Sequence, residues 1–150
     1  MLKYGLMILA LTTCFASIAN DKNDKTNPVI IADTINQPLS LSPKQVLIPG
    51  QDTSNEIKIN HLGAAFIKVH FNYFNLPAGA YVVVSDAQGT ESYVYDGTSH
   101  NHATFNGEAG EDGINQFSAM SVFGDTAIVK LVMPTNAQWE AKHGIKIDRF

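Results

Sequence analysis

The sequence has a single cysteine and no cluster of basic residues, and each of these shortages excludes a class of protein. One of the 150 residues is a cysteine, Cys14, so no disulfide framework is expected. Acidic residues outnumber basic residues by 14 to 10, and the basic ones are scattered along the chain. Because a surface that binds nucleic acid needs clustered basic residues, we do not expect a nucleic acid as partner.

Long apolar runs are limited to one, near the N-terminus. Lys3 precedes an apolar run over residues 5–16, which ends in the small residues of Ser17-Ile18-Ala19. This order is typical of a secretory signal peptide, here cleaved after Ala19. The run is shorter than the roughly 20 apolar residues of a membrane-spanning helix. We therefore predict a signal peptide at 1–19, no membrane span, and a secreted or periplasmic protein.

A lipoprotein signal that ends in Leu11-Thr12-Thr13-Cys14 is the alternative interpretation of this segment. Thr13 argues against it, because threonine is a poor residue before a lipidated cysteine. Cleavage after Ala19 would instead remove Cys14 and leave a mature chain without thiols. That chain has the length of a single domain.

Residues 20–55 are polar and are predicted to form a linker or arm. Two short apolar clusters interrupt them, Val29-Ile30-Ile31 and Val46-Leu47-Ile48. Each cluster is long enough for a short edge strand only, because such a composition buries little apolar surface and prolines limit strand length. The prolines of this segment are Pro28, Pro38, Pro43 and Pro49.

The folded domain is predicted to span residues 56–150, where polar and apolar residues alternate with the period of a β-strand. In residues 66–71, Ile67, Val69 and Phe71 are expected to face the core. His70 would then point the other way, so we interpret it as a surface or edge histidine.

Several short strands without helices between them predict an all-β fold, a β-sandwich of two antiparallel sheets that is CUB-like or jelly-roll-like. The turn at residues 86–89 is expected to join two of these strands in a hairpin. One brief helix is a candidate, at residues 136–142. The predicted strands are 66–71, 81–85, 91–95, 117–123, 126–133 and 145–147.

A polar, glycine-rich stretch at residues 96–113 is the predicted location of a metal-binding site. Histidines with nearby acids suit zinc, and closely spaced carboxylates suit calcium. The alternative is a solvated loop that binds nothing, and the spacing does not decide between the two. The candidate metal ligands are His100, His102, Glu108, Glu111 and Asp112.

Aromatic side chains offer a second candidate site, a platform for a sugar or a peptide. Its predicted members are Tyr93, Tyr95 and Trp139, with Tyr81 as a neighbour. Tyr93 and Tyr95 share one face of a strand, so the alternative is that both rings pack in the core.

No catalytic residue and no cofactor is predicted. The sequence contains no Gly-x-Ser-x-Gly setting for a nucleophilic serine, and no glycine pattern that cradles a phosphate. We therefore do not expect this chain to be an enzyme.

Five segments together resemble a known family. Residues 66–71, 74–85, 92–95, 123–129 and 143–150 are similar to the β-sandwich region that precedes the catalytic domain of secreted microbial trypsin-like serine endopeptidases. The resemblance implies a non-catalytic accessory module whose partner is a protease domain, an extracellular protein or a glycan.

In that family the peptidase domain follows the exit Ile147-Asp148-Arg149, and no residue here matches the peptidase's catalytic motifs. The expectation is therefore either a truncated protease precursor or a separate copy of the module. The alternative function is a stand-alone carbohydrate- or cell-surface-binding module.

Overall fold

β-Strands are the main regular secondary structure in the part of the chain that the structure describes, residues 31–43 and 55–150 of a computed structural model. The predicted signal peptide and the cluster Val46-Leu47-Ile48 lie outside these residues. The bounds are β1 Asn36–Leu41, β2 Glu56–Asn60, β3 Phe66–Ile67, β4 His70–Asn75, β5 Tyr81–Asp86, β6 Ser92–Tyr95, β7 Ala103–Thr104, β8 Phe117–Ala119, β9 Val122–Phe123, β10 Thr126–Val132 and β11 Gly144–Arg149.

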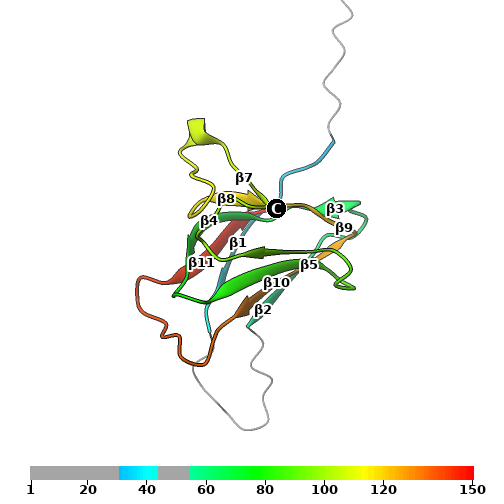
Figure 1. Cartoon of the computed structure of the whole chain (residues 1–150). Coiled ribbons are helices and arrows are strands. Elements are labelled where there is room, and N and C mark those ends of the chain that lie inside the picture. Colours follow the sequence, from blue (N-terminus) through cyan, green and yellow to red (C-terminus); the bar gives the residue numbers. More distant parts are fainter. Residues whose placement is uncertain (1–30, 44–54) are drawn as a thin grey trace, which may run out of the picture. The chain divides into compact units, whose positions relative to one another are not determined.

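The strands form two main antiparallel sheets and one small sheet (Figure 1). The five-stranded sheet has the order β1-β11-β4-β8-β7, and the four-stranded sheet has the order β2-β10-β5-β6. The two-stranded sheet consists of β3 and β9. The prediction of an all-β, antiparallel fold is confirmed, and the arrangement is that of a β-sandwich.

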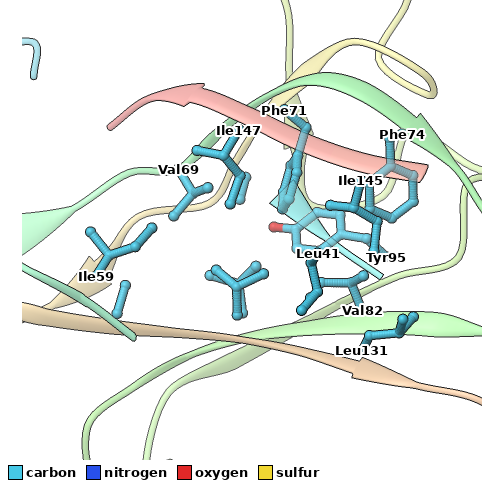
Figure 2. Packing of buried hydrophobic residues seen from close by; sticks show 14 of the residues in the cluster. Leu41, Ile59, Val69, Phe71, Phe74, Val82, Tyr95, Leu131, Ile145 and Ile147 are labelled. Atoms are coloured by element: carbon cyan, nitrogen blue, oxygen red, sulfur yellow. The ribbon is translucent and has the colours of Figure 1, made fainter. Parts of the chain in front are cut away.

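Side chains from both main sheets meet in one hydrophobic core, as alternation along the strands requires. Figure 2 shows side chains of β4 and β11 opposite those of β5 and β10. Ile67, Val69 and Phe71 are all buried, as the alternation predicted. The aromatic part of the core comprises Phe71, Phe74, Tyr95 and Phe117.

A bulge in β4 brings two phenylalanine rings into this core. Phe71 pairs with Ile147 and Phe74 pairs with Ile145, so one extra residue of β4 lies between the two register positions. The extra residue reverses the alternation locally, and both rings face inward. Their centroids are 5.2 Å apart in an edge-to-face arrangement.

Two segments predicted as single strands are each divided. Residues 66–71 contribute to β3 and β4, and residues 117–123 contribute to β8 and β9. The interruptions face each other, and the N–H of Ala119 donates to the carbonyl of Val69 between them. Both segments bend there, because each passes between the small sheet and the five-stranded sheet.

The segment predicted as a linker supplies an edge strand. β1 pairs with β11, and Leu41 at its end is buried in the core. The register shifts between Asn36 and Leu39, around Pro38, which suits a residue that cannot donate a ladder hydrogen bond. The domain therefore takes in part of the predicted arm.

The predicted helix at residues 136–142 is wrong, because the chain there is irregular, with a turn at each end. The helical segment of the described residues is a single 3₁₀ turn, η1 Gly107–Ala109, capped by the Asn106 side chain. In residues 31–43 and 55–150, no helix is long and apolar enough to cross a membrane.

Candidate functional site

His70, at the start of β4, lies on the outer face of the five-stranded sheet and is nevertheless buried. Its exposed fraction is 5%. The loop that joins β7 to β8 folds over this part of the sheet and brings Glu111 to the imidazole ring. The prediction of a surface or edge histidine is therefore wrong, because alternation along β4 does not reveal that a distant loop covers its outer face.

Two carboxylates bind the two ring nitrogens of His70. Nδ1 bonds to Oδ1 of Asp148 on β11, and Nε2 lies 2.9 Å from Oε1 of Glu111. Both ring nitrogens of His70 are therefore occupied by carboxylate partners.

Arg149 closes the cluster from the side of β11. Its Nη1 donates to Oδ2 of Asp148 at 2.8 Å, and its Nη2 donates to Oε1 of Glu111 at 3.3 Å. The cluster thus consists of His70, Glu111, Asp148 and Arg149. The pairing of Glu111 with Arg149 offsets part of the free-energy cost of burying the Glu111 carboxylate beneath the loop.

Glu111 is held by its own loop as well as by the cluster. The backbone N–H of Asn106 donates to its Oε2 at 2.7 Å. That bond, with smaller contributions from His70 and Arg149, holds the pKa of Glu111 below its ordinary value against the opposing effect of burial. Glu111 is therefore ionised in the folded protein and fastens the β7–β8 loop to strands β4 and β11.

The arrangement is a clamp and does not have the form of a nucleophilic catalytic site. In a serine or cysteine hydrolase one imidazole nitrogen faces a hydroxyl or thiol. Here both nitrogens face carboxylates, and within the described residues no hydroxyl is hydrogen-bonded to His70. Two sequence signals could have revealed the cluster around His70. They are the outward position of His70 on its strand and the Asp148-Arg149 pair near the end of β11.

The five candidate metal ligands do not converge. His100 packs against the ring of Phe105, and His102 packs against the ring of Tyr93. Glu108 is exposed on η1, and Glu111 belongs to the cluster around His70. Among the residues that the structure describes, no group of three or more His, Cys, Asp or Glu side chains could hold a metal ion.

Asp112, the fifth candidate ligand, shapes a turn. Its carboxylate accepts from the side chain of Asn115 at 2.6 Å and from the backbone N–H groups of residues 114, 115 and 116. Burial opposes ionisation, but these hydrogen bonds outweigh it and hold the pKa of Asp112 well below its ordinary value. The acidic residues of the stretch thus stabilise their own loop.

The aromatic platform predicted from Tyr93, Tyr95 and Trp139 does not form. Tyr95 is buried in the core, where its hydroxyl donates to the carbonyl of His102 and accepts from the N–H of Met120. Burial raises its pKa to about 12. Tyr93 and Trp139 are half-buried against the core. The prediction is wrong for Tyr95 because the shared strand face points inward, the alternative that the sequence left open.

A half-open hollow lies at one end of the four-stranded sheet, and we call it the Tyr81 hollow. Its cavity volume is about 370 Å³. The turn between β4 and β5 forms one wall, and the segment after β6 forms another. The lining residues are Phe74, Asn75, Leu76, Pro77, Ala78, Gly79, Ala80, Tyr81, Val94, Asp96, Gly97, Thr98 and Asn115.

Comparisons with known proteins identify no family. No family model, curated protein or solved structure matches this chain. What the chain does is therefore inferred from its own residues.

Proposed function

We propose that this chain is an exported, non-catalytic β-sandwich module that accompanies a trypsin-like serine peptidase. The observation that carries the proposal is the arrangement at His70, a buried histidine whose two ring nitrogens both bind carboxylates. Such a ring has no nitrogen left to activate a nucleophile. Its role is to hold the β7–β8 loop in place.

The motifs that resemble the peptidase-associated region support the same proposal. They fall largely on β4, β5, β6, β10 and β11, the strands that build the core and the clamp. Asp148 and Arg149 of the family's exit motif are members of the clamp itself. In the proposed module this motif secures the end of β11 to the sheet.

An exposed apolar surface is suited to docking against a partner domain. Phe66 on β3 and Phe123 on β9 are cross-strand partners, and the exposed fraction of Phe123 is 76%. Leu62 is also exposed, on the turn between β2 and β3. We call Phe66 and Phe123 the β3–β9 surface. Exposed apolar patches of this kind mark interaction sites.

The non-catalytic part of the proposal is tested with the mature chain, residues 20–150. Casein and peptide substrates are incubated with it, with and without a serine-directed inhibitor. We expect no hydrolysis above a buffer control. Inhibitor-sensitive hydrolysis that is abolished by His70→Ala would overturn the proposal.

The accessory part is tested by reading the gene beyond the last codon and beside it for a trypsin-like peptidase frame. The encoded peptidase domain is then titrated with the mature chain in a calorimeter. We expect binding that Phe123→Ser weakens about tenfold or more. Val94→Ser, an exposed apolar residue on β6, is the matched control. Absence of such a frame, or binding unchanged by Phe123→Ser, contradicts this part.

A further inference from the structure

We infer that the Tyr81 hollow is a binding site for a neutral glycan. This inference goes beyond the accessory role, because the hollow and the β3–β9 surface are lined by different residues. Its volume of about 370 Å³ lies within the roughly 300–1,000 Å³ of ligand pockets. The ligand class follows from the aromatic, polar and charged groups that line it.

An exposed aromatic ring and an aliphatic side chain form the apolar part. Tyr81 and Val83 lie on the same face of β5, and Val94 on β6 is the cross-strand partner of Val83. Tyr81 and Val94 are therefore diagonal neighbours on the outer face of the sheet. Their exposed fractions are 36% and 52%. A flat apolar surface of this kind suits the C–H face of a sugar ring.

The hydroxyl of Tyr81 is available to a ligand. The hydroxyls of Tyr73, Tyr93 and Tyr95 each donate to a protein oxygen. That of Tyr81 has no hydrogen-bond partner within residues 31–43 and 55–150. It combines an apolar ring face with a polar tip that a sugar hydroxyl can reach.

The remaining polar groups are mostly acceptors held in place. Nδ2 of Asn75 donates to the carbonyl of Lys142 at 3.1 Å, and Nδ2 of Asn115 donates to Asp112 at 2.6 Å. Each amide is thereby oriented, and its oxygen has no partner among the described residues. Such acceptors suit a ligand that is rich in hydroxyl donors.

The charge of the hollow disfavours anionic ligands. Among the described residues that line the hollow, Asp96 is the one that carries a charge. The backbone N–H of Thr98 donates to Asp96 at 2.9 Å and holds the pKa of its carboxyl below the ordinary value. Asp96 is therefore ionised at neutral pH, and it repels a phosphate, a sulfate or an acidic sugar. A neutral polyhydroxylated ligand meets no such repulsion.

The inference is tested by calorimetric titration of the mature chain with cellohexaose and with chitohexaose. We expect at least one of these neutral oligosaccharides to bind, and Tyr81→Ala to weaken that binding about tenfold or more, equivalent to about 1.4 kcal/mol. Tyr73→Ala is the matched control, because Tyr73 is a tyrosine of similar exposure on β4, outside the hollow. It should leave the affinity unchanged.

Two further titrations separate the ligand classes. A heparin hexasaccharide and calcium chloride should both fail to bind the hollow. The inference is overturned if neither neutral oligosaccharide binds up to about 1 mM, if Tyr73→Ala and Tyr81→Ala weaken binding equally, or if heparin or calcium binds in their place. Phe123→Ser should leave glycan binding intact, so failure here is distinct from failure of the accessory role.

Discussion

His70 on β4 and Glu111 in the β7–β8 loop are separated by 41 residues in the sequence, and their side chains meet at 2.9 Å. The contact joins the outer face of the five-stranded sheet to the longest polar stretch of the domain. Asp148 and Arg149 complete it from β11. The loop is thus held by charge pairing in addition to its own turns.

Removing Glu111 should loosen this loop. Glu111→Ala leaves His70 and Arg149 without one of their acceptors beneath the loop, and we expect the free energy of unfolding to fall by about 1–3 kcal/mol. Urea unfolding gives the loss, and hydrogen exchange of residues 106–113 shows whether the loop opens. Glu108→Ala, an exposed acid of the same loop, should change stability by less than about 0.5 kcal/mol. Equal losses for the two variants would contradict the clamp.

Acid should destabilise the domain through the same loop. Glu111 and Asp112 have pKa values held below their ordinary values of 4.5 and 3.8. The unfolded state therefore binds protons at a higher pH than the folded state does. The stabilisation is complete above the ordinary pKa values and is lost as the pH falls through the lowered ones.

Thermal unfolding between pH 7 and pH 2 measures this loss. The double variant Glu111→Gln, Asp112→Asn should show a shallower decline of melting temperature in acid than the unmodified chain. Asp86 and Asp96, whose pKa values are also lowered, account for the decline that remains. An acid limb of unchanged slope in the double variant would contradict the assignment.

The hydroxyl of Tyr95 should matter more than its position in an apolar core suggests. It bonds the carbonyl of His102 and the N–H of Met120, each at 2.8 Å. Tyr95→Phe keeps the ring and removes both bonds, so we expect a loss of about 1–3 kcal/mol in urea unfolding. Tyr81→Phe removes a hydroxyl that has no described partner and should leave stability unchanged. If Tyr95→Phe is also neutral, the two bonds do not stabilise the fold.

Gly113 is required for two reasons that a pair of variants can separate. Its φ is 75°, and a Cβ there would lie 2.7 Å from a ring carbon of Phe105. Gly110 has a φ of 87°, and no atom of the described residues lies within 4 Å of the same position. Gly110→Ala should cost about 1 kcal/mol from the backbone alone, and Gly113→Ala about 1 kcal/mol more from the clash. Equal melting temperatures for the two variants would show that Phe105 moves aside without cost.

The sequence could predict the sheet-forming segments because burial on one face leaves a local period-two pattern. Ile67, Val69 and Phe71 alternate in the sequence and all face the core. The hairpin of β5 and β6 lies at the predicted turn, and the alternation predicts that Tyr93 and Tyr95 share one face of the strand. These features depend on neighbours within a few residues.

Tertiary structure alone decided what covers the outer faces and which polar groups meet. Alternation places His70 opposite the core side chains, but only the distant loop that carries Glu111 decides that His70 is buried on this face. The same loop separates the five candidate metal ligands, and the pairing of β1 with β11 turns part of a polar arm into an edge strand. Contacts between residues far apart in the chain leave no local period, because each depends on where the backbone returns in space.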